Sequence, residues 1–313
     1  MAKLLFRKKA LLAKVETTYG TDAAPTGALN AIQTRNLQIE PLNGDPLEFD
    51  VDTELLGAKA MSLVGRHVKV TFEVAAAGSG VVGTAPAWGV LMRGAGHTET
   101  LDAAPGSEKA TYKPLDTDTP SLTMWVLVGR TLHKVTGCRG SVKFSSKKRE
   151  YPWLQFEFMG LFSNPIDQNT SLGTVLSAFL QPQPFRADVV EFELGANLAG
   201  LHEVSVDFGQ KVEFYEHSEE EQIMQVDRKA NWQATIEEPD IGTHNYYADV
   251  NNDTVMAFSY VHGTVAGNIV EIACPKTQIM QPRRQAVQDI AALQVQGNFI
   301  QDGSGPEYSV IVR

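Results

Sequence analysis

The chain has 313 residues, of which 43% are hydrophobic and 20% are charged, and its formal net charge is −10. This length predicts about two domains, and the composition is sufficient for an ordinary buried core in each. The acidic balance argues against a protein that wraps DNA, because phosphate binding needs a dense positive surface, although DNA could still slide past such a protein. No apolar run has the length of a membrane helix, and Met1–Lys9 lacks the uninterrupted apolar stretch of a secretory signal, so we expect the chain to fold in a cytoplasm.

Residues 1–34 are predicted to form an arm outside the core. Ala10–Val15 is short and apolar, and Glu16–Gly27 is rich in turn-forming and small residues. Such a segment cannot bury enough surface to stay ordered alone, so we expect it to lie against a neighbouring subunit. The candidate inter-subunit side chains are Leu11, Leu12, Val15, Tyr19 and Pro25.

Alternating apolar and polar residues predict half-buried strands at residues 68–73, 154–158 and 293–299. Each of these strands should have one face in the core and one face in water. By contrast, Leu122–Val128 is apolar on both faces and should be covered on both sides. The fold class is therefore mainly β, with two tandem sandwich or barrel domains and at most a short helix in each.

Two segments have helical spacing. Pro86–Arg93 is predicted to be a short helix capped by Thr84 and ended by Gly94 and Gly96. A second helix is expected at Leu172–Phe179, before two prolines. The face that the first helix should bury consists of Trp88, Leu91 and Met92.

The second half of the chain repeats the first, weakly but in order. Asn36–Glu40 matches Glu203–Asp207, and Val68–Glu73 matches Trp232–Glu237. Duplicated β units in one chain are common in ring and array architectures. The repeat divides the chain into an arm (1–34), a first domain (35–162), a connecting segment (163–195) and a second domain (196–313).

The two cysteines mark corresponding places in the repeat. Cys138 begins a run that ends at Gly160, and Cys274 begins one that ends at Gly297. Equivalent positions in two similar domains normally lie beyond the reach of a disulfide. We therefore expect two buried, reduced thiols that act as small hydrophobic groups.

No motif in the chain predicts catalysis, a metal or a cofactor. Gly78–Gly83 spells GxGxxG, but the long helix of a dinucleotide fold is missing, so a flexible surface loop is expected. Asp249–Asp253 begins like a calcium loop, but Thr254 and Tyr260 stand where glycine and glutamate are needed, which favours a polar turn. The histidines have no metal-ligand spacing, and no nucleophile motif is present. We expect a protein that is not an enzyme.

Charged loops occur at matching places in both repeats. Val51–Glu54 and Tyr215–Glu221 are acidic, whereas Lys147–Arg149 and Arg283–Arg284 are basic. These loops are either solvated turns and charged hairpin tips that protect a sheet edge, or contacts between stacked rings. The candidate inter-ring residues are Asp52, Glu54, Lys147, Lys148, Arg149, Glu219, Glu220, Glu221, Arg283 and Arg284.

Ala10–Thr26, followed by Asn30–Ile32 and Leu37–Leu42, resembles the opening of the major tail proteins (tail tube proteins) of long-tailed, non-contractile bacteriophages. Pro86–Gly96 is similar to the short helix of that family. The resemblance covers about the first hundred residues best, and the remainder fits through the repeat.

This resemblance implies a structural subunit of the virion tail, assembled in the host cytoplasm. Family members form rings whose inner strands join into a large β-barrel, and the rings stack around the tape measure protein. Most members have one domain and form hexamers, so this duplicated chain is expected to form homotrimeric, pseudo-hexameric rings. The implied partners are other copies of the chain, the tape measure protein, the tail terminator, and the baseplate and distal tail proteins, while DNA passes without specific binding during ejection.

A barrel lumen needs strands with one polar face that does not hold DNA. Apart from Lys69, the polar faces of the predicted strands are neutral or acidic and have no aromatic side chain on which a base could stack. The ordinary solvent face of a sandwich would look the same. The candidate lumen-facing residues are Thr71, Glu73, Gln155, Glu157, Gln233, Thr235, Glu237, Gln294 and Gln296.

The alternative interpretation is a tandem β-sandwich binding or decoration protein of a virion, such as a capsid or fibre accessory. Such a protein would hold its partner with loops and would not stack. Contractile tails contain tubes of the same architecture, so the sequence does not separate contractile from non-contractile tails.

Overall fold

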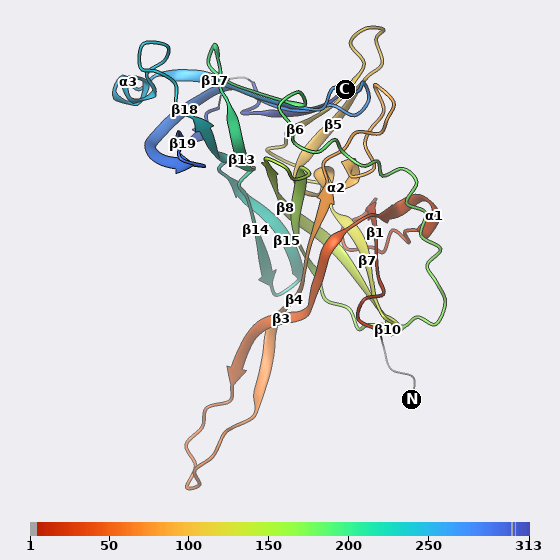
Figure 1. The fold of residues 1–313 in the computed structure, drawn as a ribbon. Helices are drawn as coiled ribbons and strands as arrows, with labels where there is room; N and C mark the ends of the chain where they lie inside the picture. The colour runs from red at the N-terminus through yellow and green to blue at the C-terminus, as the bar shows by residue number, and fades with distance from the viewer. Residues whose placement is uncertain (1–4, 302, 304) are drawn as a thin grey trace.

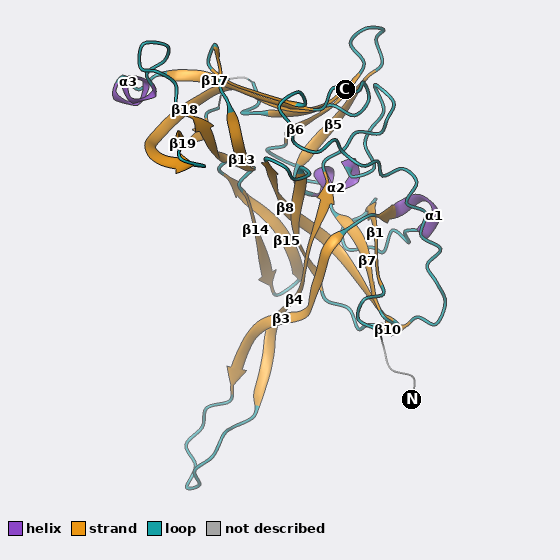
Figure 2. Cartoon of the chain, in the orientation of Figure 1, coloured by secondary structure: helices purple, strands orange, loops and turns teal. Residues whose placement is uncertain are grey.

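A computed structural model of the chain describes residues 5–301, 303 and 305–313. The fold is mainly β, as predicted, and helices contribute only three short segments in this part of the chain (Figures 1 and 2). Most strands form one large antiparallel sheet. The other two, at residues 210–217 and 220–228, pair only with each other and form a separate hairpin.

The first half of the molecule, residues 9–167, contains β1 (Lys9–Val15), α1 (Gly27–Asn30), β2 (Ala31–Ile32), β3 (Arg35–Glu48), β4 (Met61–Ala75), α2 (Gly89–Gly94), β5 (His97–Asp102), β6 (Lys109–Pro114), β7 (Leu122–Val128), β8 (Thr131–Lys147), β9 (Trp153–Leu161) and β10 (Ile166–Asp167). The second half, residues 190–312, contains β11 (Val190–Leu194), β12 (Asn197–Leu198), β13 (Leu201–Asp207), β14 (Gln210–His217), β15 (Glu220–Arg228), β16 (Asn231–Glu237), α3 (Tyr246–Asn251), β17 (Val255–His262), β18 (Val270–Val287), β19 (Ile290–Phe299) and β20 (Ser309–Val312).

The same order of strand pairing occurs in both halves. In the first half, β1 pairs with β2 and β7, β7 with β8, β8 with β9 and β10, β9 with β4, and β4 with β3. In the second half, β11 pairs with β12 and β17, β17 with β18, β18 with β19 and β20, β19 with β16, and β16 with β13.

The register of these pairs tests the sequence repeat residue by residue. Val68 pairs with Gly160, and Trp232 pairs with Gly297, as the proposed match requires. The match of Asn36–Glu40 with Glu203–Asp207 is wrong by two residues. Val70 pairs with Ile39, and its counterpart Ala234 pairs with Val204, so Ile39 corresponds to Val204. Period-two alternation survives a shift of two, which is why the sequence pattern did not reveal this error.

Both cysteines have equivalent partners, because Cys138 pairs with Leu122 and Cys274 with Phe258. Both thiols are buried and free, which confirms the prediction. Burial raises the pKa of Cys138, and it raises the pKa of Cys274 to about 11. The thiols are therefore protonated at neutral pH and behave as small apolar groups.

The two halves share one sheet and one core. β8 pairs with β13, so an eight-stranded order of β3-β4-β9-β8-β13-β16-β19-β18 runs through both halves. A second junction joins β6 to the C-terminal strand β20. A single cluster of buried apolar side chains extends across these junctions, where the ring centroids of Phe144 and Tyr260 lie 5.2 Å apart.

The N-terminal segment is part of this fold, so its interpretation as an arm is wrong. β1 lies between β2 and β7 of the same chain, and Leu11 and Leu12 are 1% exposed. Pro25 is also buried, whereas Val15 and Tyr19 are half-buried against the chain's own residues. The apolar residues of this segment complete the sheet of their own chain, because a strand with two partners satisfies its backbone donors and acceptors.

Two helix predictions need correction. α2 starts at Gly89 rather than Pro86 and has no side-chain cap, while Thr84 lies in the preceding turn. Its predicted face is confirmed, since Trp88, Leu91 and Met92 are at most 1% exposed. The segment Leu172–Phe179 is not helical; it runs as an extended connection in which most apolar side chains are partly exposed.

Three loop or strand interpretations also change or become clearer. The expected turn at Asp249–Asp253 begins inside α3. Gly78–Gly83 is a loop, but it is held by the second half, where the Gly80 N–H donates to the Gly267 carbonyl at 2.9 Å. β7 is buried at Leu122, Thr123, Met124 and Val126, but Trp125, Leu127 and Val128 are only half-buried, so the expected cover on both sides is incomplete toward the end of the strand.

Candidate functional site

The candidate site is the polar face of the eight-stranded sheet. Residues that pair directly across antiparallel strands present their side chains on the same face, so the register traces this face from β4 to β18. The opposite face carries the buried apolar residues of the core, such as Phe72, Phe156 and Val206. Three rows cross the junction of the two halves: Glu73, Gln155, Lys143, Asp207, Asn231 and Asn298; Trp153, Ser145, Ser205, Gln233 and Gln296; and Lys147, Glu203, Thr235, Gln294 and Arg283.

These rows contain six of the nine candidate lumen residues, and the other three lie on the same face. Thr71 pairs with Glu157, and Glu237 continues the alternation of β16 beyond Thr235. Thr235 differs from the expectation because it is only 2% exposed: it donates to Glu203 and accepts a hydrogen bond from Gln285. Shallow hollows of about 450 and 370 Å³ follow the face on either side of β8.

The face contains more cations than the sequence analysis proposed, and most of them are paired. Besides Lys69, it carries Arg35, Lys143, Lys147 and Arg283. The nitrogen–oxygen distances of its ion pairs are 2.8 Å for Lys69–Glu157, 2.5 Å for Arg35–Glu73, 2.8 Å for Lys143–Asp207 and 3.6 Å for Lys147–Glu203. The hydrogen bond to Glu157 also raises the pKa of Lys69. Adjacent opposite charges cancel at a distance, so the face presents a weak field.

One aromatic side chain lies on the polar face, which the sequence analysis missed. Trp153 pairs with Ser145 and therefore points to the polar side at the start of β9. The Arg35 guanidinium lies 3.6 Å from the centre of its ring, and Arg35 is itself held by Glu73. The cation covers the ring face on which a base could stack.

The two acidic loops form the tips of equivalent hairpins. β3 and β4 make a long hairpin that projects from the body of the molecule, with residues 49–60 at its tip (Figure 1). β14 and β15 form its counterpart, which is shorter and turns at residues 218–219. Asp52 and Glu54 are exposed at the first tip, and Glu219, Glu220 and Glu221 are exposed at the second.

These hairpins differ in what covers them. The short hairpin packs against the first half, with Ile223 fully buried and Phe214 stacked on His67 at 5.7 Å. At the long hairpin, Phe49 is 73% exposed and Leu55 is 84% exposed. Large apolar side chains in water are characteristic of an interaction surface.

The basic segments do not occupy matching hairpin tips. Lys147 ends β8 opposite Glu203, and the turn that follows is tied to the second half, because the Lys148 N–H donates to the His202 carbonyl at 2.9 Å. This edge of β8 is therefore paired rather than protected by charge. Arg283 and Arg284 lie inside β18, and the hairpin turn comes later, at Gln288–Asp289.

A buried carboxylate that the sequence analysis did not single out fixes the N-terminal segment. Glu16 is 9% exposed and accepts hydrogen bonds from Ser121 Oγ at 2.6 Å, Thr123 Oγ1 at 2.9 Å, and the N–H groups of Gly20 and Gly137 at 2.9 and 2.8 Å. Nearby, Tyr19 accepts the Ile223 N–H at 2.6 Å. These contacts place the Glu16–Tyr19 loop between β8 and the short hairpin.

Within the described residues, no group of three or more His, Cys, Asp or Glu side chains is arranged to hold a metal ion. In the same part of the chain, no helix has the length and apolar character needed to span a membrane. Neither a scan against protein-family models nor a search of curated proteins gave a match to this sequence.

Proposed function

We propose that the chain is the structural subunit of a tail tube of a long-tailed, non-contractile bacteriophage, and that it assembles as stacked trimeric rings. The observation that carries this proposal is the junction of β8 with β13, which joins two halves of equal pairing order into one sheet. The outer strands of that sheet are β3 and β18, which are the repeat counterparts of β13 and β8. β18 of one chain can therefore meet β3 of the next chain as β8 meets β13 within the chain.

Repeating this contact closes a ring. Each chain would supply two tail-tube-like units of four inner strands, so three chains would supply six units. A barrel of about 24 strands, spaced and tilted as barrel strands usually are, has a backbone diameter on the order of 50 Å. Such a barrel leaves a wide bore after side chains project inward. Pro41 in β3 contributes no backbone donor, which suits an edge strand but shortens the ladder between chains.

The polar sheet face suits the wall of this bore. Its paired charges offer few free cations to phosphate, and Arg35 covers its aromatic ring, so DNA would meet little that binds it. The tape measure protein would occupy the bore before ejection, and the tail terminator and the baseplate and distal tail proteins would meet the two ends of the tube.

The first test is the state of the purified protein. We expect a particle of three times the 34.2 kDa chain mass by light scattering, and rings or short tubes in negative-stain micrographs. A protein that stays monomeric at high concentration, alone and with tail initiation components, would favour the decoration protein instead.

A cysteine pair tests the proposed contact directly. The register makes Val287 the counterpart of Ser145 and Glu40 the counterpart of Ser205, which face each other within the chain. Glu40→Cys with Val287→Cys should give covalent dimers and trimers, and nothing larger, under mild oxidation. The matched control is Ser145→Cys with Ser205→Cys, which should form a bond inside one chain, because directly opposed strand residues lie within disulfide reach.

A further inference from the structure

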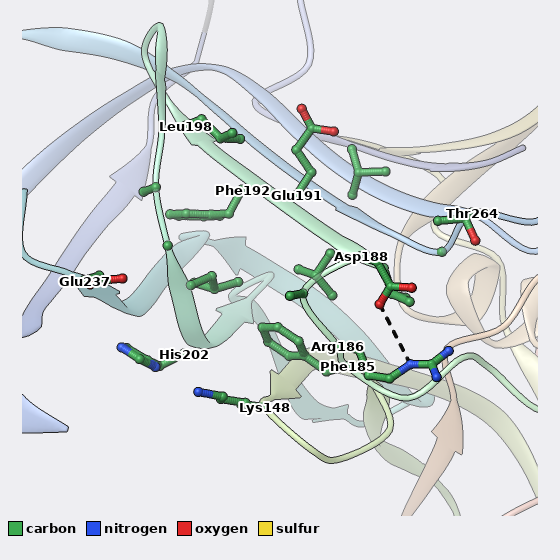
Figure 3. Close-up of a pocket in the computed structure, with 18 of the residues that line it drawn as sticks. Lys148, Phe185, Arg186, Asp188, Glu191, Phe192, Leu198, His202, Glu237 and Thr264 are labelled. Carbon is green, nitrogen blue, oxygen red and sulfur yellow. Dashed lines mark ion pairs between the residues drawn. The ribbon is translucent and has the colours of Figure 1, made fainter. Parts of the chain in front are cut away.

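A groove of about 880 Å³ lies at the junction of the two halves, as Figure 3 shows. Its lining comes from the β8–β9 turn, the segment that leads into β11, and the start of β13. β8 runs in the same direction as β4, since each is antiparallel to β9, so the end of β8 lies at the end of the sheet opposite the β3–β4 tip. Each chain therefore has one groove at one end and one long hairpin at the other.

The groove has an apolar lining and a basic corner. Phe185, Phe192 and Leu201 supply apolar surface, while Lys148 and His202 lie close together at one side (Figure 3). Arg186 has its own partner, with 4.0 Å between its Nε and an oxygen of Asp188, and the remaining acidic residues of the lining are Glu191 and Glu237.

The basic corner has unused hydrogen-bonding and charge capacity. Lys148 and Arg149 are exposed, and in the described part of the chain neither has a carboxylate within ion-pair distance. His202 has two buried ring nitrogens without a hydrogen-bond partner among the described residues. Buried polar atoms normally have partners, and a polar group would reach these nitrogens only if the side chains over them moved aside, so the exposed cations Lys148 and Arg149 are the groups that an approaching acid would meet first.

The tip of the long hairpin has the complementary character. Leu55 and Leu56 are 84% and 105% exposed, and Asp52 and Glu54 beside them are exposed acids. Lys59 is already bound to Asp50 at 2.5 Å, so the free charge of the tip is negative.

We propose that the β3–β4 tip of one chain docks into this groove of a chain in the adjacent ring. This inference rests on the proposed tube and identifies the contact by which its rings stack. The leucines would fill the apolar part of the groove, and Asp52 and Glu54 would face Lys148, Arg149 and His202. One tip and one groove per chain give equal numbers of both on the two meeting faces of trimeric rings.

A cross-linking experiment tests the docking. Leu56→Cys places a thiol at the tip, and Leu198→Cys places one at an exposed position of the groove lining; the native thiols are buried. Because each chain would be joined to one above and one below, oxidised tubes should give a ladder of covalent species that continues beyond three chains. The control combines Leu198→Cys with Glu219→Cys on the short hairpin and should give no ladder.

A charge-reversal cycle gives an independent measure. Asp52→Lys with Glu54→Lys, or Lys148→Glu with Arg149→Glu, should each lower the yield of tubes about tenfold or more while rings still form, because like charges would then face each other. Combining both sets should restore the yield, whereas Glu219→Lys with Glu220→Lys should leave it nearly unchanged.

The outcomes separate the two proposals. Tubes that form without the long ladder, or reversals that show no mutual rescue, would overturn the docking and leave the proposed ring intact. A protein that forms neither rings nor tubes would overturn both.

Discussion

At the scale of single residues, buried polar side chains join segments that are far apart in the chain. His97 is fully buried, with Nδ1 3.1 Å from the Met92 carbonyl and Nε2 3.0 Å from the Tyr308 hydroxyl. Met92 belongs to α2, and Tyr308 directly precedes β20. The imidazole therefore links the two halves, and it does so as a neutral group, because burial lowers its pKa to about 4.

This shifted pKa predicts a loss of stability in acid. The ordinary histidine pKa is 6.5, so as the pH falls the unfolded chain takes up the proton before the folded chain does. The stability associated with neutral His97 is complete above pH 6.5, declines between pH 6.5 and about 4, and is lost below that range. The total is on the order of 3 kcal/mol. His97→Asn should be less stable at neutral pH, with a shallower decline in urea unfolding free energy across this range.

Phe192→Leu is the control for this measurement. Phe192 is 1% exposed and does not titrate, and its ring contacts are with Trp232 and Phe258 rather than with the imidazole. Its loss should lower stability by a similar amount at every pH. If the unfolding free energy of His97→Asn declined with falling pH as steeply as that of the unchanged protein, His97 would not be the group responsible for the decline.

Hydrogen bonds between residues far apart in the chain were the feature that the sequence predicted least. Glu16 lies in a segment rich in turn-forming residues, and that composition led us to expect a loop outside the core. Three of its four hydrogen-bond donors, at Ser121, Thr123 and Gly137, are more than a hundred residues away. No local pattern reports such partners, so the carboxylate that orders the segment could be recognised only in the fold.

At the scale of elements, period-two alternation located the strands well, and helical spacing performed poorly. The buried face of α2 was predicted correctly, because its apolar residues do pack against the core. Leu172–Phe179 has the same spacing, but it leads into two prolines, which have no N–H to donate to a helix, and it lies on the surface with Val175 51% exposed. Spacing alone does not show that a surface exists for a helix to cover.

The repeat predicts that two glycines are under the same constraint. A Cβ at Gly160 would lie 2.4 Å from Val135 Cγ1, and one at Gly297 would lie 2.4 Å from the Gln278 carbonyl oxygen. Gly160→Ala and Gly297→Ala should each destabilise the fold by roughly 1–3 kcal/mol in denaturant unfolding. Gly242→Ala is the matched control, because no atom lies within 4 Å of its added Cβ and its effect should be close to zero. If Gly297→Ala left the free energy of unfolding unchanged, the two glycines would be equivalent in sequence but not in packing.

At the scale of the whole molecule, the pairing of strands between the two halves could not be predicted from the sequence. Alternation tells which face of a strand is polar, but it does not tell which strand lies beside it. The pairing of β8 with β13 depends on a connection of more than fifty residues, and the pairing of β6 with β20 depends on an insertion present in the first half only. The expected tandem of separate units thus became a continuous sheet over a shared core.

A shared sheet and core predict that the halves unfold together. Trp88 in the first half and Trp232 in the second are each 1% exposed, so each reports on the packing of its own half. With 5-fluorotryptophan incorporated and the resonances assigned by Trp→Phe variants, both signals should disappear at the same urea concentration and with the same steepness. Coincident transitions from distant probes are the mark of one cooperative unit. Two separated midpoints would mean that the β8–β13 and β6–β20 junctions contribute little, and that each half is stabilised by its own part of the core.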